Sequence, residues 1–193
     1  HSPQITVRGG GFDSLEAVEC YDLITAINDP FAYLLEIGQR VDALARLYRA
    51  LRPGGILFLE IKNFLYKLFY REPYTEEVDF VDGKRVAHMM QHEIDFHKGL
   101  WIHRDEYIVE GQPKAVVKTH QVAIIPPQEL LYFLNQQGFV DVQTYNSYEA
   151  RTSEELNDRL ILVSARKPQS DAQLMTVKPI NKAAPTPIHF VDV

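Results

Sequence analysis

The first third of the chain alternates short apolar runs with longer stretches of helical periodicity. Residues 21–27, Tyr-Asp-Leu-Ile-Thr-Ala-Ile, form a nearly continuous apolar run, which predicts a strand buried on both faces of a parallel sheet. Between Phe31 and Leu51, apolar residues recur at spacings of three and four, which predicts one or two amphipathic helices. The Arg-Pro-Gly-Gly segment at 52–55 is expected to end them in a turn, and residues 56–61 predict the next buried strand. This order predicts a right-handed parallel crossover in an α/β architecture.

The middle of the chain has a different pattern. Near the N-terminus, residues 5–8 predict a short strand ahead of the glycines at 9–11. In the middle of the chain, the aromatic-rich segment 64–70 predicts a helix or a lid. From residue 78 to residue 125, apolar runs separated by Asp-Gly and Lys-Gly turns predict an antiparallel meander. Because both faces of the run at 100–109 are mixed in polarity, the meander is expected to cover another part of the molecule.

The last third returns to core elements and then loses its periodicity. Residues 128–137 predict a helix with proline in its first turn and Gly138 at its C-terminal end. Strands are expected at 140–145 and at 159–165. The remaining residues hold four of the eleven prolines and predict an extended tail, with residues 188–191 as a docking segment.

Composition places the chain among globular proteins. Of its 193 residues, 46% are hydrophobic and 24% are charged, which is far from the profile of a disordered chain. The net charge of −6 and the pI of about 5.6 argue against a nucleic-acid binder with a basic surface. The single cysteine, Cys20, excludes a disulfide framework and fits a reducing compartment.

The termini and the hydropathy pattern bear on localisation. The sequence has no uninterrupted apolar stretch of about 18 residues, which argues against a membrane span. Residues 1–4 lack the basic and apolar regions of a secretory signal, so we expect a cytoplasmic protein. They also lack an initiator methionine, and we expect a processed product or a fragment of a longer protein.

The order of these elements resembles the second half of the class I S-adenosylmethionine-dependent methyltransferases. The resemblance covers roughly residues 5–167, and its ordered set of motifs is more specific than any single one. The meander resembles the insertion that many small-molecule members place over the active site. The motifs are Tyr21-Asp22-Leu23-Ile24, Leu51-Arg52-Pro53-Gly54-Gly55, Ile56-Leu57-Phe58-Leu59-Glu60, Gln137-Gly138-Phe139 after the late helix, and the final strand at 159–165.

The resemblance implies an α/β fold, a partial Rossmann-like methyltransferase sheet whose parallel strands are joined by an antiparallel last strand. An antiparallel β insertion is added to this core. On this basis the chain divides into four parts: the second half of the parallel core (1–63), an aromatic lid and the β insertion (64–125), the final helix and strands (126–167), and the proline-rich tail (168–193).

The resemblance also implies S-adenosylmethionine as cofactor, with about half of its pocket in this chain. The family's glycine-rich donor turn and its ribose-binding carboxylate belong to earlier strands, and neither precedes Ile5. Gly10, Gly11 and Phe12 align with the motif that contacts the adenine. Gly11 stands where the family has aspartate, so Asp13 is the candidate replacement. A role in a turn alone is the alternative for the glycines.

The resemblance places candidate catalytic residues after the fourth strand of the family. There, at the carboxyl edge of the sheet where ligands bind, Asn28 and Asp29 are candidates for facing the sulfonium or an acceptor amine, and Asn28 is also a candidate cofactor contact. A turn with a helix cap is an equally good interpretation. Aromatic candidates also admit packing in a core or lid. The candidate substrate-binding residues are Phe31, Tyr33, Asn63, Tyr66, Trp101 and Arg104.

Five of the seven histidines lie between residues 88 and 120. His88 and His92 share one face of a helix or a strand, and a cross-strand His103 would complete a three-histidine metal site. Because no acidic ligand is clearly grouped with them, we expect no metal site. A general base in the covering sheet is the favoured role, with His103 as the catalytic candidate.

The sequence therefore predicts methyl transfer to a small molecule or a side chain by a domain of which this chain alone is an inactive part. A non-catalytic binding or assembly module is the alternative, which the absent donor turn and Gly11 favour. A metal-dependent enzyme is a weaker third hypothesis. We expect neither nucleic acid nor membrane as partner, but a second copy or another chain that covers the open sheet edge.

Overall fold

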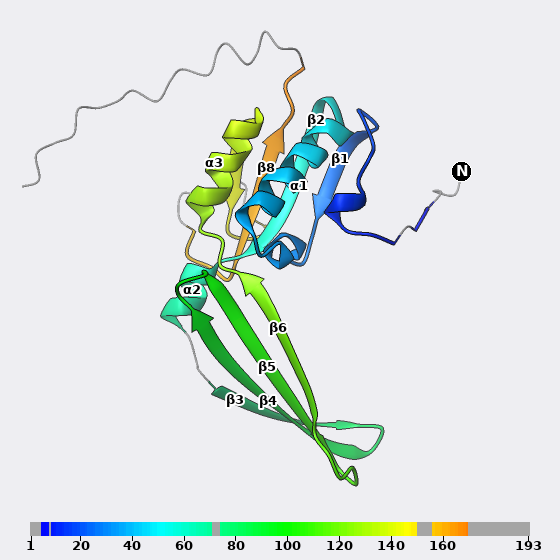
Figure 1. The fold of residues 1–193 in the computed structure, drawn as a ribbon, viewed down its shortest axis with the longest axis vertical. Coiled ribbons are helices and arrows are strands. Elements are labelled where there is room, and N and C mark those ends of the chain that lie inside the picture. The colour runs from blue at the N-terminus through cyan, green and yellow to red at the C-terminus, as the bar shows by residue number, and fades with distance from the viewer. Residues whose placement is uncertain (1–4, 8, 71–73, 150–155, 170–193) are drawn as a thin grey trace, which may run out of the picture.

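The computed structural model describes residues 5–7, 9–70, 74–149 and 156–169, so the tail from 170 and its docking segment lie outside the described residues. The strands form two four-stranded sheets (Figure 1). The mixed sheet has the order β1-β2-β8-β7, and the meander sheet has the order β3-β4-β5-β6. The strands are β1 (Tyr21–Ala26), β2 (Leu51–Lys62), β3 (Tyr74–Val81), β4 (Lys84–Asp95), β5 (Leu100–Val109), β6 (Val116–Ala123), β7 (Val140–Tyr145) and β8 (Leu160–Arg166). The helices are α1 (Ile37–Ala50), α2 (Phe64–Phe69) and α3 (Pro127–Gln137), with 3₁₀ turns η1 (Phe12–Ser14) and η2 (Pro30–Tyr33).

The mixed sheet confirms the expected strand–helix–strand unit. β1 and β2 are parallel, with Ile24 opposite Leu57, and α1 connects them. β8 is antiparallel to both of its neighbours, β2 and β7, as the resemblance implied for the final strand. Helix α3 also has nearly its expected range and ends at Gly138, whose φ of 95° is the left-handed conformation common at helix ends.

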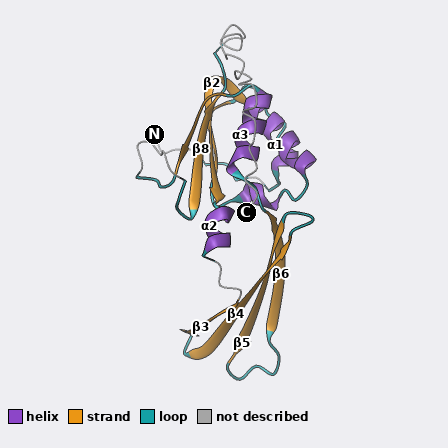
Figure 2. Ribbon diagram, turned by 90° about the vertical axis from the view of Figure 1, so that its left-hand side faces the viewer, coloured by secondary structure: helices purple, strands orange, loops and turns teal. Residues whose placement is uncertain are grey.

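Helices α1 and α3 lie on one face of the mixed sheet (Figure 2). On that face, Leu57, Leu59 and Ile61 are at most 1% exposed. On the other face, Leu23 is 57% exposed. The prediction that the strand at 21–27 is buried on both faces is therefore wrong. The reason is that β1 is the edge strand and no described helix covers its second face.

The strand expected at residues 5–8 is wrong in its described part. Residues 5–7 have no regular structure, and Ile5 and Val7 are 84% and 89% exposed. A strand requires a neighbour that accepts and donates its backbone hydrogen bonds, and none of the described strands pairs with this segment.

The Arg-Pro-Gly-Gly segment forms a bulge in β2 rather than a separate turn. β2 begins directly after α1, and its pairing with β1 jumps from Tyr21–Leu51 to Leu23–Ile56. Gly54 has a φ of 80°, and a Cβ atom on Gly55 would lie 3.1 Å from the carbonyl oxygen of Tyr21. Both positions therefore require glycine, one for its conformation and one for the close approach of the neighbouring strand.

The meander sheet confirms the expected antiparallel insertion, and α2 confirms a helix between it and the mixed sheet. His92, His103 and His120 lie directly opposite one another on β4, β5 and β6. Trp101 and Val122, near one end, are buried in the same core as the mixed sheet. The other end projects away from the mixed sheet (Figures 1 and 2). The meander sheet thus covers the core with one end only.

Candidate functional site

Polar side chains gather where β1 and β2 end against the near end of the meander sheet. Asn28 and Asp29 follow β1, Lys62 ends β2, and Lys67 lies on α2. Asn28 and Asp29 have φ angles of 67° and 57°, a left-handed conformation that strains residues other than glycine and recurs at functional sites. Ligands of open α/β sheets bind at this edge.

Asp29 is a buried carboxylate at the start of η2. It is 2% exposed, and neither of its oxygens has a partner among the described residues. Burial raises the pKa of Asp29 to about 6. The backbone N–H and the ammonium of Lys62 lie nearby and lower the pKa, but neither forms a hydrogen bond to the carboxylate oxygens. The nearby charge of Glu60 adds to the increase. The carboxylate therefore changes protonation close to physiological pH.

Asp29→Asn is expected to stabilise the protein above pH 6 and to leave it unchanged below pH 4. The folded-state pKa of about 6 exceeds the ordinary 3.8, so the contribution of Asp29 to stability is present below pH 4 and is lost as the pH rises through 6. The variant has no charge to bury, so it should gain about 2 to 3 kcal/mol over the wild type at pH 8. Urea unfolding at pH 4 and pH 8 measures this gain.

Asp141→Asn is the matched control, because Asp141 also has a positive φ, of 51°, but its side chain is 70% exposed. Its effect on the free energy of unfolding should differ little between the two pH values. If Asp29→Asn changes stability equally at pH 4 and pH 8, burial does not raise the pKa of Asp29.

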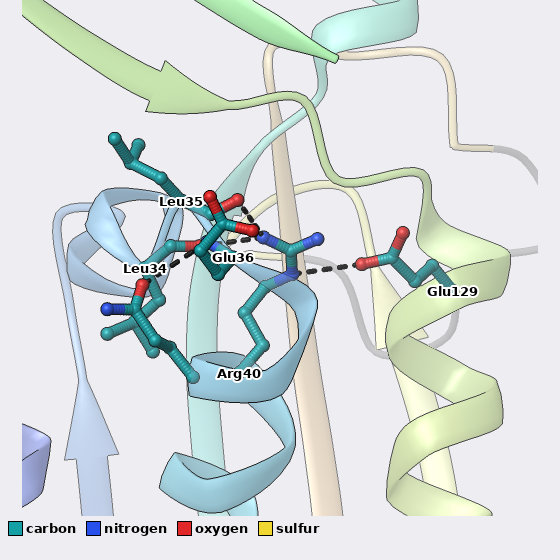
Figure 3. Close-up of polar contacts among 6 residues, drawn as sticks. Leu34, Leu35, Glu36, Arg40 and Glu129 are labelled. Atoms are coloured by element: carbon teal, nitrogen blue, oxygen red, sulfur yellow. Dashed lines mark hydrogen bonds and ion pairs between the residues drawn. The ribbon is translucent and has the colours of Figure 1, made fainter. Parts of the chain in front are cut away.

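A buried arginine holds the loop that carries Asp29. Arg40, 4% exposed, donates from Nη1 to the carbonyl oxygens of Leu34 and Leu35 at 2.7 and 3.1 Å, directly after η2. Its Nε donates to Oε1 of Glu129 on α3 at 3.0 Å (Figure 3). Residues from α1 and α3 therefore fix the end of η2 and, through it, the position of Asp29.

His103 lies in a row of rings across the meander sheet. Its ring stacks on His120 with 4.5 Å between centroids, and it meets His92 edge-on at 4.8 Å. Tyr33 of η2 stacks on His120 at 6.3 Å, so the row reaches the loop after β1. His103 is 8% exposed, and its Nε2 has no hydrogen-bond partner in the described part of the chain.

The surroundings of His103 keep its imidazole neutral. Burial lowers its pKa to about 3, and the positive charges of Lys67 and the neighbouring histidines contribute to the decrease. A neutral imidazole accepts or donates a hydrogen bond at Nε2 according to its tautomer. A general base works best when its pKa is near the working pH, so Asp29 fits this role better than His103.

A cleft of about 1020 Å³ opens beside these groups, and it is large enough for a small-molecule ligand. We call it the junction cleft, because α2, the meander sheet and the start of β8 all contribute to its wall. The lining residues are Lys62, Tyr66, Lys67, Tyr70, Thr75, Glu77, Met90, His92, Trp101, Asn146, Ser147, Tyr148, Asp158, Arg159 and Leu160.

Two of the predicted substrate-binding residues, Tyr66 and Trp101, line the junction cleft. Arg104 does not, because alternate residues of a strand point to opposite faces. It lies on the face of β5 away from Trp101, where it contacts Gln91 and Glu106. The structure therefore does not bring Arg104 to this site.

The other predicted substrate-binding residues have structural surroundings of their own. The Nδ2 atom of Asn63 donates to the carbonyl oxygens of Leu156 and Asp158, and its Oδ1 caps α2 by accepting from the backbone N–H of Tyr66. Phe31 is 1% exposed in the core. Tyr33 is 58% exposed and keeps a free face beside the row of histidines.

The segment predicted to bind the cofactor lies against the same loop. The ring of Phe12 meets Phe31 edge-to-face at 5.9 Å, which places residues 10–13 beside η2. Gly10, with a φ of 142°, has no room for a side chain, because a Cβ atom would lie 2.2 Å from Oγ of Ser14. Gly11, Asp13 and Asn28 are exposed, so their polar groups face solvent at this edge.

The histidines share a strand face as predicted but have other partners. Nε2 of His88 lies 2.9 Å from Oδ1 of Asp105, and its ring stacks on Tyr107. Nε1 of Trp101 donates to Nδ1 of His92 at 3.3 Å. Within the described ranges, no group of three or more histidine, cysteine or acidic side chains is arranged to hold a metal ion.

Sequence reasoning missed two features of the site. The ammonium of Lys67 lies 5.3 Å from the ring centroid of Trp101, and the hydroxyl of Tyr148 donates to Oε2 of Glu60. Lys67 carried a usable signal, since it follows Lys62 by five residues at the carboxyl end of β2. The pair of Tyr148 and Glu60 has a separation of 88 residues and no local signal.

Solved structures of methyltransferases share this arrangement of sheets and helices. The CcbJ methyltransferase from Streptomyces caelestis matches 82% of this chain with a TM-score of 0.68 and 18% identity. A S-adenosylmethionine-dependent methyltransferase from Clostridium acetobutylicum matches 82% with a TM-score of 0.64 and 15% identity. The amino pentose methyltransferase CalS10 from Micromonospora echinaspora, solved with S-adenosylmethionine bound, matches 82% with a TM-score of 0.64 and 16% identity. The chain has a methyltransferase fold.

The chain covers less than two thirds of each of these three structures. The chain spans 62% of the CcbJ structure and 63% of the other two. No protein-family model and no curated protein matches the sequence, so the solved structures establish the fold and leave the activity to be argued from the site. In the described part of the chain, no helix is long and apolar enough to cross a membrane.

Proposed function

We propose that this chain is part of a S-adenosylmethionine-dependent methyltransferase that acts on a small molecule or a side chain bound in the junction cleft. The observation that carries the proposal is the carboxylate of Asp29, which is buried and has no hydrogen-bond partner among the described residues, at the carboxyl end of a parallel strand in a methyltransferase fold. Leaving a buried carboxylate without partners costs free energy. That cost is understandable if the carboxylate meets a cationic or protonated ligand.

Asp29 is the proposed catalytic residue of the chain. Asp29 does not itself line the cleft, but it is within electrostatic reach of Lys62 and Lys67, which do. With a pKa of about 6, its carboxylate is able to take a proton near neutral pH from an acceptor amine that reaches past these two lysines. A negative charge here also favours a positively charged sulfur nearby. S-adenosylmethionine, when bound, supplies a methyl group activated by that sulfur. His103 does not line the cleft, but its neutral ring packs against His92 and Trp101, which do, and so supports this wall. Trp101 excludes water from the end of the cleft.

Residues 10–13 and Asn28 supply the cofactor contacts of this chain. Gly10 and Gly11 allow close approach of the backbone, and the exposed side chains of Asp13 and Asn28 offer polar groups at the same edge. The remaining contacts are proposed to come from polypeptide that pairs with β1. Its support is the open edge of β1, where Leu23 is 57% and Ile27 46% exposed, because parallel sheets are normally covered on both faces.

Calorimetry with S-adenosylmethionine tests this two-sided pocket. The chain by itself is expected to show no measurable binding, because its residues form only one wall. The full polypeptide in which the chain is encoded is expected to bind the cofactor and to transfer its methyl group to an amine acceptor, detected as a mass increase of the acceptor. Micromolar binding to the chain alone would contradict the two-sided pocket, and failure of the full polypeptide to bind would contradict the enzyme.

A non-catalytic binding or assembly module is the second candidate. The uncovered apolar face of β1 favours it, since an exposed strand edge readily pairs with another chain, and so does the glycine at position 11. The same calorimetry separates the two functions. A module would associate through β1 without binding S-adenosylmethionine in any form of the protein.

A further inference from the structure

Two lysines of the junction cleft have no anionic partner among the described residues. The Lys62 and Lys67 side chains are each half-buried and line the same cleft. Neither ammonium forms a hydrogen bond or an ion pair with any described residue. Lys67 contacts the ring of Trp101, and its pKa is lowered by burial and by the charge of Lys62. The two like charges are thus held close together in a partly dehydrated wall, which is unfavourable without an anion.

None of the described carboxylates in this region forms an ion pair with either lysine. Glu60 accepts a hydrogen bond from Tyr148. Asp29 is close enough to influence Lys67, but it is buried, does not line the cleft and forms no ion pair. Of the two described acidic residues that line the cleft, Asp158 accepts from the backbone N–H of Arg159 at 2.6 Å, and Glu77 is exposed on β3.

Aromatic side chains complete the wall around the lysines. The indole of Trp101 is 1% exposed. The ring of Tyr66 on α2 and that of Tyr70 directly after it lie with their centroids 4.5 Å apart. Tyr148 closes the cleft from the loop after β7. Clefts that combine aromatic walls with a few convergent polar groups are typical of small-molecule sites, and planar rings pack well against such walls.

We propose that the junction cleft binds a ligand that carries a phosphate or carboxylate group on a planar ring, with the anion held by the ammonium groups of Lys62 and Lys67. The ring packs on the aromatic wall formed by Tyr66, Tyr70 and Trp101. This inference rests on the proposed function in that the ligand is the methyl acceptor. The binding site itself belongs to the described residues and needs no cofactor.

Binding of simple probes tests the inference. Phenyl phosphate, benzoate and phenol are titrated into the protein, and the fluorescence of Trp101, the only tryptophan of the chain, reports binding. Phenyl phosphate and benzoate are expected to bind at least about tenfold more tightly than phenol, because hydrogen bonds between charged groups are stronger than neutral ones. Their affinities should fall as salt is added. The anion that binds more tightly, phenyl phosphate or benzoate, identifies the charged group that the cleft recognises.

Variants locate the anion. Lys67→Gln and Lys62→Gln should each lower the affinity for the more tightly bound anion by about tenfold. The affinity for phenol should not change. Lys67→Arg should retain binding because it keeps the charge. Lys84→Gln is the control, since Lys84 is exposed at the β3–β4 turn and should change affinity by less than about twofold. Far-UV circular dichroism verifies that each variant is folded.

The outcomes separate this inference from the proposed function. Equal affinity for phenol and the two anions, or unchanged anion binding in both glutamine variants, would overturn the anion site. If anions bind as expected and the full polypeptide transfers no methyl group, the site stands and the enzyme is wrong. If methyl transfer to a neutral acceptor is unaffected by Lys67→Gln and the probes do not bind, the enzyme stands and the anion site is wrong.

Discussion

Replacing Trp101 with alanine is expected to lower the free energy of unfolding by about 3 to 5 kcal/mol. Trp101 is 1% exposed and is the largest fully buried side chain where the meander sheet meets the core. Its ring packs on Phe64 with 5.7 Å between centroids. Truncation therefore removes apolar burial and leaves a cavity between the two sheets that the strands cannot close.

Trp101→Phe is the matched variant, because it keeps an aromatic ring beside Phe64 and loses the hydrogen bond to His92. Trp101→Phe should lower the free energy of unfolding by less than half as much as Trp101→Ala does. Thermal unfolding followed by circular dichroism measures both. We expect alanine to lower Tm by about 10 °C. If the Tm of Trp101→Ala lies within about 2 to 3 °C of the Tm of Trp101→Phe, the two sheets are not joined through this side chain.

Replacing Arg40 with alanine is expected to lower the free energy of unfolding by about 3 kcal/mol. Arg40 is 4% exposed and satisfies two backbone carbonyl groups as well as Glu129. Removing one partner of a buried ion pair leaves the other charge without compensation, and the carbonyl groups lose their donor. Since Glu129 is still 24% exposed, water recovers part of its hydration.

Arg46→Ala on the same helix is the control. Arg46 pairs with Asp42 across one helical turn at 2.7 Å and donates to the carbonyl oxygen of Asp13 at 2.9 Å. Because these contacts are exposed to solvent, their loss should cost less than about 1 kcal/mol. Urea unfolding of both variants at pH 7 gives the comparison. If the two arginines contribute equally, the loop after η2 is held by other contacts, and Arg40 has no special part in positioning Asp29.

The structure explains why the site combines residues from four separate segments. The carboxyl ends of β1 and β2 lie side by side because the strands are parallel and adjacent. The short helix α2 begins directly after β2 and carries Lys67 toward Trp101. Asp29 and His103 are 74 positions apart in the sequence, yet both are influenced by the charges of the same two lysines.

The sequence predicted the secondary structure well wherever local pattern and turn chemistry agreed. The meander followed from Asp-Gly and Lys-Gly turns between β-branched runs, and the end of α3 followed from Gly138. The glycines at 54 and 55 were recognised as structural, but their place within β2 was missed. A bulge differs from a turn only by the strand that pairs with it, and that information is not local.

By itself, the sequence determined the α/β class, the parallel pairing of β1 with β2, the antiparallel final strand and the candidate carboxylate at position 29. The α/β class and the parallel pairing depend on the spacing of apolar residues and on turn residues, which act over a few positions along the chain. The antiparallel final strand and the candidate at position 29 followed from the resemblance of the ordered motifs to the methyltransferase family. Only the tertiary structure decided that β1 has an uncovered face, that Arg104 points away from the cleft, and that Lys62 and Lys67 share a wall in which no described carboxylate pairs with them. Burial and charge pairing arise from contacts between segments far apart in the sequence, so no local pattern encodes them.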